Sequence, residues 1–419
     1  MRTPSNPQQK QRHGIKAIIS SLRHRNFRLF WTGQCISLVG TWMQNMAQSW
    51  LVLELTGSPF LLGLVGGLQF VPLLFFALIA GAVADRLPKR PLLLFTQGMS
   101  MLFALVLGLL TLYNVVQYWH VAVLAFLLGT INALDMPARQ AFIIELVGRE
   151  DLMNAIALNS SIFNGARIIG PAVAGLVIST VGIAACFLAN AASFLFVLGG
   201  LLLVRVRGEV DGREDHRNLW EDVHEGLAYI RSNSTVFTVL AMVGGMSALA
   251  MNFNVLVPVF AREVLHRQAQ GFGFLMSATG LGAFAGALTV AYLSNRGPRL
   301  KLLLAGASGL CFCELMLAPV RLYSLALVLL CLAGFAVSTF SASANATVQM
   351  NVPDHLRGRV MSVYSLVFIG LVPAGNFFSG TVAHLWGAPA GFALGGGLAL
   401  LFLLFLGRRL LRQQHSPVP

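Results

Sequence analysis

The feature that most constrains this chain is a succession of apolar stretches, each long enough to cross a lipid bilayer. A helix needs about 20 mainly apolar residues to span the hydrocarbon core. The stretch PFLLGLVGGLQFVPLLFFALIA, residues 59–80, meets that requirement. The sequence predicts twelve such spans, at residues 27–53, 58–84, 91–113, 120–146, 155–181, 183–204, 236–260, 271–294, 300–320, 323–347, 359–384 and 388–407.

The spans leave no room for a large soluble domain. Only 11% of the residues are charged, whereas soluble proteins carry about 25%. We therefore predict an all-α integral membrane protein with twelve transmembrane helices. The longest polar stretch divides the spans into two six-helix halves. The predicted order is a cytoplasmic N-tail at 1–26, a first half at 27–204, a cytoplasmic linker at 205–235, a second half at 236–407 and a cytoplasmic C-tail at 408–419.

The distribution of basic residues predicts the orientation. The net charge is +13, and 24 of the 29 lysines and arginines fall on one side of the predicted spans. Basic loops stay in the cytoplasm, so both termini are predicted to be cytoplasmic in an inner or plasma membrane. The charge is thereby explained by topology, and no nucleic-acid partner is expected. Within the linker, Trp220, Val223, Leu227 and Ile230 are spaced as on an amphipathic helix, either lying along the interface or simply joining the halves.

Polar residues recur every third span, in the first, fourth, seventh and tenth. Single polar residues in a span often bond helix to helix. The first span instead carries six at intervals of mostly three or four, which form one stripe along a helix. We interpret the stripe as one wall of a water-filled substrate cavity. The predicted cavity residues are Gln34, Ser37, Thr41, Gln44, Asn45, Gln48, Asn132, Asn252, Asn254, Ser338, Ser341 and Asn345.

Four charged residues lie inside predicted spans and well away from the span ends. Asp135 and Arg139 are four apart and can pair on one helix face, either to close the cytoplasmic end or to bind substrate. Arg167 lies twelve residues into the fifth span, so it needs a carboxylate, carbonyl groups or water. Glu314 lies deep in the ninth span, where burial favours a protonated carboxyl. It either carries a coupling proton or simply bonds to a neighbouring hydroxyl.

Small residues in two spans predict close helix packing. The fifth span contains GARIIGPAVAG, with Gly165, Gly170, Pro171 and Gly175, and the eighth offers a complement with Gly282 and Gly286. No phosphate-binding loop, HExxH motif or Cys/His cluster occurs. The five cysteines all lie in spans. We therefore expect no disulfide, cofactor, metal or enzymatic activity.

The turn GAVADRLPKR, residues 81–90, resembles the signature loop of the major facilitator superfamily. Pro88 replaces its usual glycine. The resemblance implies a gating latch in which the acid caps a helix of the other half and the arginines meet an acid on the fourth span, here Asp135. The latch residues are Gly81, Asp85, Arg86, Lys89 and Arg90, together with Asp135 and Arg139.

Two further stretches narrow the resemblance. GARIIGPAVAG is similar to the fifth-span motif of proton-coupled antiporters, and residues 133–160 look like the macrolide and enterobactin exporters. That subgroup and this chain lack the arginine found early in the fourth span of other drug antiporters. Arg167 and Glu314 become the candidate coupling residues in its place.

The resemblance implies a secondary active transporter, acting as a monomer by alternating access between two halves. Its expected partners are the lipid bilayer, protons and an amphipathic small molecule, a drug or siderophore, that is exported as protons enter. Uptake or symport on the same fold is the first alternative. A non-transporting scaffold or receptor is the second, although it would need no wet interior. An integral membrane enzyme lacks a recognisable catalytic set.

Overall fold

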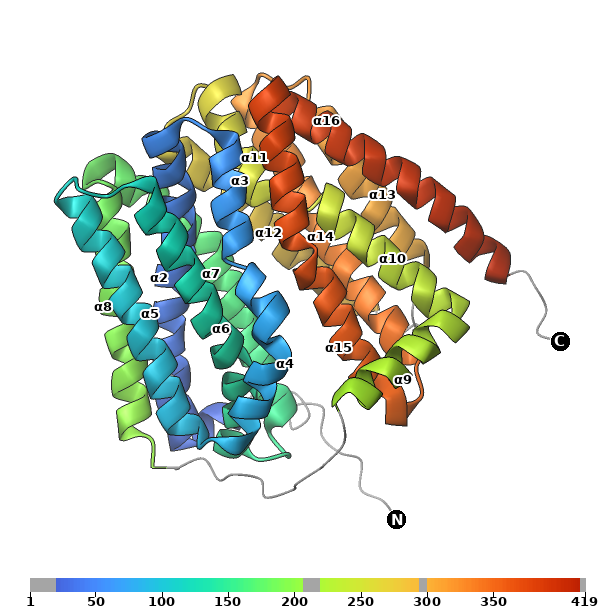
Figure 1. The fold of residues 1–419 in the computed structure, drawn as a ribbon, viewed down its shortest axis with the longest axis horizontal. Coiled ribbons are helices and arrows are strands. Elements are labelled where there is room, and N and C mark those ends of the chain that lie inside the picture. Colours follow the sequence, from blue (N-terminus) through green and yellow to red (C-terminus); the bar gives the residue numbers. More distant parts are fainter. Residues whose placement is uncertain (1–19, 206–218, 294–299, 415–419) are drawn as a thin grey trace, which may run out of the picture.

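The computed structural model describes residues 20–205, 219–293 and 300–414, which form helices joined by short turns (Figure 1). In chain order the helices are η1 Ser20–Arg23, α2 Arg25–Thr56, α3 Pro59–Leu68, α4 Val71–Arg86, α5 Lys89–Leu112, α6 Tyr118–Val147, α7 Leu152–Thr180, α8 Ile183–Leu203, α9 Leu219–Ser232, α10 Ser234–Leu249, α11 Phe253–Val259, η2 Phe260–Val264, α12 Ala269–Leu293, α13 Leu300–Leu317, α14 Tyr323–Met350, α15 Asp354–Gly370 and α16 Val372–Gln414.

Ten helical segments in the described part are long and apolar enough to cross a membrane. The protein is therefore a multi-pass, all-helical membrane protein, as the sequence predicts. The 32-residue helix α2 is not among the ten, because its polar stripe lowers its hydropathy. The last of the ten covers 55 residues, Asp354–Arg408. It includes Gly387, whose φ of 81° and ψ of 166° break the helix.

Local sequence determines where several helices begin and end. Gly57 ends α2 in the left-handed conformation with a φ of 60°, which glycine adopts without steric cost. Ser58 then caps α3 by accepting a hydrogen bond from the Leu61 amide, and Pro59 occupies the first helical turn, where its missing N–H is not needed. Asn233 caps α10 in the same way, from the Val236 amide.

Three predicted spans are built from more than one helical piece. The second consists of α3 and α4, and the seventh of α10, α11 and the π-helix η2. The eleventh begins as α15 and continues into α16 beyond Leu371. The length of an apolar stretch indicates a membrane segment, but it does not show where the helix inside that segment is interrupted.

The helices pack in two groups, which follow the chain (Figure 1). Helices α2 to α8 form the N-terminal group and α10 to α16 form the C-terminal group, and the two groups pack on each other through α3 against α16 and through α7 against α12. We call the end where Arg86, Lys89, Arg357 and Arg359 lie the basic end. The opposite end, with the turns at Gly57, Gly182 and Gly387, is the far end.

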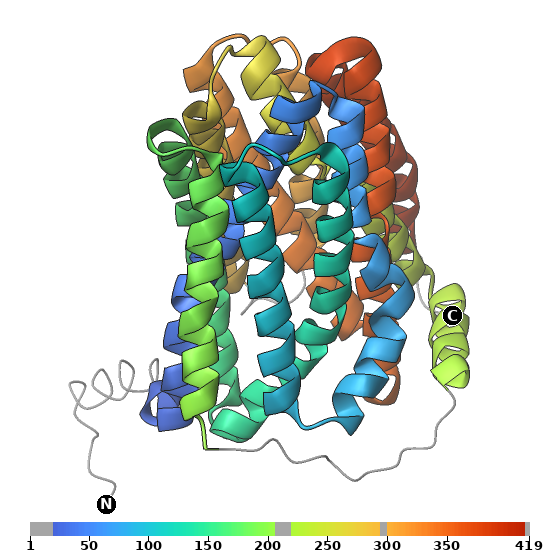
Figure 2. The same ribbon diagram turned by 60° about the vertical axis from the view of Figure 1, so that its left-hand side comes forward.

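The two groups meet from the far end to the middle of the molecule. An added Cβ at Gly63 of α3 would overlap the Asn376 carbonyl oxygen of α16, and one at Gly273 of α12 would overlap the Pro171 carbonyl oxygen of α7. Trp50 stacks on Phe272, with ring centroids 5.9 Å apart. Toward the basic end, α4 and α15 diverge (Figure 1). In the second view, the long helices of both groups run in roughly the same direction (Figure 2).

The predicted linker helix is α9, and it packs against α15 at the basic end (Figure 1). Ile230 is buried, Leu227 is exposed, and the side chains of Trp220 and Val223 lie outside the described part. An ion pair joins Arg359 of α15 to Glu225 of α9. The linker helix is thus attached to the C-terminal group.

Candidate substrate cavity

A cavity of about 410 Å³ lies inside the N-terminal group. Its walls come mainly from α2, α5, α6, α7 and α8, and polar side chains alternate with apolar ones around it. A space of this size holds a small organic molecule. Its polar lining residues are Gln34, Ser37, Thr41, Gln44, Asn45, Gln69, Gln97, Ser100, Asn132, Asp135, Arg139, Gln140, Asn159 and Asn190.

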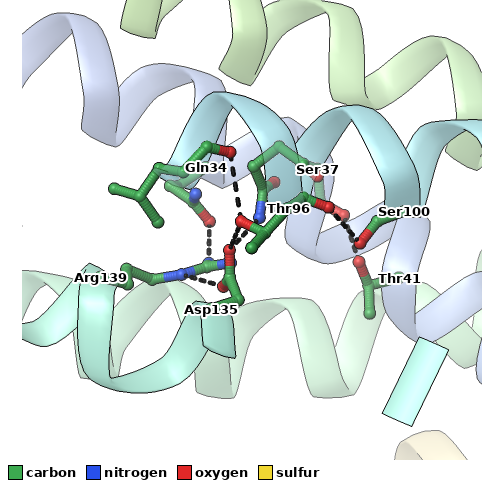
Figure 3. Close-up of polar contacts among 9 residues, drawn as sticks. Gln34, Ser37, Thr41, Thr96, Ser100, Asp135 and Arg139 are labelled. Carbon is green, nitrogen blue, oxygen red and sulfur yellow. Dashed lines mark hydrogen bonds and ion pairs between the residues drawn. The ribbon is translucent and has the colours of Figure 1, made fainter. Parts of the chain in front are cut away.

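A buried ion pair forms one side of the cavity (Figure 3). The Arg139 Nε lies 2.9 Å from Asp135 Oδ2, and its Nη2 also donates to that oxygen. Thr96 and Gln97 of α5 each donate to Asp135 Oδ1 at 2.7 Å. Arg139 Nη1 donates to the Gln34 side-chain oxygen at 2.5 Å. Three helices are thereby joined through one carboxylate and one guanidinium.

An amide pair forms a second polar contact in the wall. The Asn190 amide nitrogen of α8 donates to Gln44 Oε1 of α2 at 2.7 Å. Gly40 makes this approach possible, because an added Cβ there would lie 2.5 Å from Asn190 Oδ1. The polar stripe of α2 therefore serves both the cavity and helix packing.

The predicted cavity residues divide between two places. Six of them line this cavity, namely Gln34, Ser37, Thr41, Gln44, Asn45 and Asn132. Gln48 is buried on the same helix but outside the lining. The other predicted residues belong to the C-terminal group: Asn252 is buried beside Gly375, Asn254 is exposed, and Ser338, Ser341 and Asn345 are half-buried on α14.

Sequence reasoning missed the cavity residues of α5. Thr96, Gln97 and Ser100 are buried within an apolar span, and Asp135 receives two of its hydrogen bonds from them. Their spacing of one and four residues within LLLFTQGMS was a usable signal, because polar groups inside a span tend to face its interior.

Arg167 lies near the middle of α7. Its guanidinium carbon is 5.9 Å from the centroid of the Trp42 ring, within the range of a cation–π contact. The Trp42 ring meets Phe163 edge-on, with centroids 5.6 Å apart. Among the described residues, no acid forms an ion pair with Arg167.

Glu314 is buried in the C-terminal group, away from the cavity. Its side chain lies between α13 and α16, and an added Cβ at Gly395 would lie 3.5 Å from Glu314 Oε2. Neither carboxyl oxygen has a hydrogen-bond partner in the described part of the chain. Arg167 and Glu314 are thus separate sites and do not pair with each other.

The predicted latch residues lie along the basic end. Arg86 ends α4 and is exposed, Lys89 is buried at the start of α5, and Gly81 has open space around it. Arg90 donates to the carbonyl oxygens of Leu201 and Leu202 at 2.8 and 2.9 Å, which holds α5 against the end of α8. The side chain of Asp85 lies outside the described residues.

The predicted packing residues contact different helices. Gly170 faces α2, Gly175 faces the start of α12, and open space surrounds Gly165. Gly282 and Gly286 face α14, where an added Cβ at Gly282 would overlap the Cys331 carbonyl oxygen. The expected pairing of Gly282 and Gly286 with the fifth span is therefore corrected: α12 meets α7 through Gly273 and Gly280 instead.

Comparison with known families identifies the type of protein. The model of the transmembrane secretion effector family, within the major facilitator superfamily, matches residues 16–416. The chain belongs to this family. The resemblance drawn from the sequence is confirmed, and so is the prediction that the chain is a transporter of this superfamily and not an enzyme.

Curated members related to this chain are transport proteins. The multidrug efflux pump Tap of Mycolicibacterium fortuitum is 29% identical over 84% of this chain and 88% of its own length. The staphyloferrin A transporter of Staphylococcus aureus is 24% identical over 88% and 92%. Macrolide efflux protein A of Streptococcus pyogenes is 24% identical over 89% and 93%.

Solved structures agree on the fold. The nucleoside transporter NupG aligns with a TM-score of 0.76 at 13% identity, over 92% of this chain and 99% of its own. A bacterial homologue of the lysosomal transporter Spinster, in an inward-facing and unoccupied conformation, aligns with a TM-score of 0.73 at 13% identity, over 94% and 99%. At this identity the alignments support a common fold alone.

Proposed function

We propose that this family member is a proton-coupled exporter of an amphipathic small molecule, a drug or a siderophore. The observation that carries the proposal is the polar cavity inside a membrane bundle, in a chain whose relatives include efflux pumps. Amide and hydroxyl groups line the cavity beside Phe70, Phe163 and Phe194. Such a lining suits a ligand with both apolar and hydrogen-bonding parts.

We further propose twelve spans in two six-helix halves. Helix α2 is the first span, and Gly387 divides the last long segment into two. The basic end is then cytoplasmic, which places both termini inside the cell membrane. With the groups in contact from the far end to the middle, the present conformation is open toward the cytoplasm. The exposed Arg86 corresponds to a released latch, which engages when the cytoplasmic side closes.

Glu314 is the candidate proton carrier in this proposal. Its two oxygens are buried without hydrogen-bond partners among the described residues, and an isolated charge is costly there, so the neutral acid is favoured in this conformation. Export requires that the carboxyl release its proton in one state and regain it in the other. Movement of α16 against α13 at Gly395 and Gly396 would change its exposure.

Transport is tested in inverted membrane vesicles that contain the full chain. An acid-inside pH gradient is followed with a pH-sensitive dye while macrolides, lipophilic cations and siderophores are added singly. Protein-dependent collapse of the gradient by one compound supports proton-linked export. If no compound collapses it, while ligand-induced thermal stabilisation identifies a binder, proton-linked export is wrong for that binder.

A further inference from the structure

We propose that Arg167 forms the anion-binding part of the transport site, so that the exported molecule carries a carboxylate or a similar anionic group. This inference rests on the proposed function and narrows its substrate class. It starts from an arginine in mid-membrane. Arg167 is fifteen residues from the start of α7 and thirteen from its end, so it lies about 20 Å from either end at helical rise.

The helices around Arg167 supply no acid. It lies where α7 packs between α2 and α12: Gly170 contacts Trp42 of α2, and Gly280 of α12 lies against the Arg167 backbone. Neither α7 nor α12 contains an aspartate or glutamate, and α2 contains only Glu54. Glu54 is twelve residues beyond Trp42, or about 18 Å along the helix.

The other charged groups nearby are already accounted for. Helix α8 carries no charged residue. Helix α6 carries Asp135, Arg139 and Glu145, of which Asp135 is bound to Arg139. Glu145 lies in the last turn of α6 and has a contact of its own. A guanidinium stays protonated in proteins, so the positive charge of Arg167 is left for a counter-ion.

The cavity brings a ligand within one helical turn of this charge. Phe163 lines the cavity and precedes Arg167 by four residues, which places both on one face of α7. Within the described part of the chain, the charged residues of the cavity lining are Asp135 and Arg139, whose charges offset each other. Arg167 and Trp42 lie outside this lining, one helical turn beyond Phe163, so Arg167 is the nearest positive charge left for the anionic group of a ligand in the cavity.

The aromatic pair beside Arg167 adds a second element of recognition. Trp42 and Phe163 meet edge-on, and the Trp42 ring also faces the guanidinium. A flat apolar body can pack against Phe163 while its carboxylate reaches Arg167, whose planar fork binds carboxylates in a bidentate manner. The arrangement favours an amphipathic anion over its neutral ester.

The test compares two ligands that differ only in this charge. Binding of 1-pyrenebutyrate and of its methyl ester is measured by fluorescence titration on the purified full chain in detergent. Wild type should bind the acid about tenfold or more tightly than the ester, since charge-assisted hydrogen bonds are strong. Arg167→Gln should abolish the preference, Arg167→Lys should retain part of it, and Arg231→Gln, at an exposed position on α9, should leave it unchanged.

Several results would overturn the proposal. Equal binding of acid and ester by wild type, no binding of the acid, or a preserved preference in Arg167→Gln would each do so. Comparing the acid-to-ester affinity ratio between variants cancels the different detergent partitioning of the two ligands and any change in overall stability. Proton-linked export by wild type, together with a preserved preference for the acid in Arg167→Gln, would overturn the anion site alone. Absence of proton-linked export in wild type would overturn the proposed function.

Discussion

Two buried acids in this protein differ in what compensates their charge. Asp135 accepts hydrogen bonds from Arg139, Thr96 and Gln97, so each of its oxygens has a partner. Glu314 has no hydrogen-bond partner among the described residues. Asp135 is therefore suited to a structural ion pair, and Glu314 is suited to reversible protonation.

Removing the charge of Asp135 should destabilise the N-terminal group. Asp135→Asn leaves the half-buried Arg139 without its carboxylate, and since breaking a fully buried pair costs about 3–5 kcal/mol, this partly exposed pair should cost less than that but more than a single hydrogen bond. Thr96→Val, which removes one hydrogen bond to the same carboxylate, should cost about 1 kcal/mol. Thermal unfolding in detergent measures both. Equal and small losses would show that the ion pair adds nothing beyond an ordinary hydrogen bond.

Replacing Glu314 by glutamine should separate coupling from folding. The amide side chain has nearly the same shape as the protonated acid, so the Tm of Glu314→Gln should stay within a few degrees of the wild-type value, because an uncharged side chain already suits this site. Proton movement driven by substrate should fall to the background of empty vesicles. Full proton coupling in Glu314→Gln would exclude Glu314 as the carrier.

For single residues, the sequence identified the charged side chains inside the spans but not their partners on other helices. The four-residue spacing of Asp135 and Arg139 was enough to predict their pair, because one helix fixes it. The contacts of Asp135 with Thr96 and Gln97, and the separation of Arg167 from Glu314, depend on how different helices pack. Spacing within one helix carries no information about either.

The helices approach one another most closely at glycines. On α12, Gly273 and Gly280 face α7 whereas Gly282 and Gly286 face α14. One helix thus contacts its own group on one side and the opposite group on the other. Such positions tolerate no side chain, because the neighbouring atoms belong to backbone.

Alanine substitutions should discriminate between these positions. Gly282→Ala forces a Cβ against the Cys331 carbonyl oxygen and should cost about 1–3 kcal/mol through the shift it imposes. Gly165→Ala, in the same kind of helix but facing open space, should be neutral or stabilise by about 0.5–1 kcal/mol. Unfolding temperatures of the two variants test this, and similar values for both would contradict the packing.

The lengths of the apolar stretches predicted most of the spans to within a few residues. The predicted segment 183–204 is α8, Ile183–Leu203, and 91–113 is α5, Lys89–Leu112. The interruptions were not predictable in this way. The break between α3 and α4 directly precedes Pro72, and the π-helix Phe260–Val264 follows Pro258. Proline interrupts helical hydrogen bonding, which hydropathy does not record.

At the scale of the whole molecule, the far end joins the two groups. Arg262 of η2 donates to the Leu53 carbonyl oxygen at the end of α2. Trp50 stacks on Phe272, and Phe60 meets Phe377 edge-on with centroids 5.6 Å apart. These contacts must break if the far end opens during transport.

Removing the Arg262 contact should therefore shift the conformational balance. A hydrogen bond from a charged group contributes about 1.5–3 kcal/mol, so Arg262→Gln should raise the far-end-open population about tenfold or more. Spin labels at Asn114 and Leu322, exposed at the far end of each group, would report it as a longer distance by pulsed electron paramagnetic resonance. The five native cysteines are replaced first. An unchanged distance distribution would contradict a gate at this end.

The central claim is that proton entry drives export. Its most direct test is the uptake of an identified substrate into inverted vesicles under an acid-inside pH gradient, with and without a protonophore. We expect accumulation above the external concentration, lost when the protonophore collapses the gradient. Accumulation that persists without the gradient, or a gradient that drives the substrate out of the vesicles, would contradict the account.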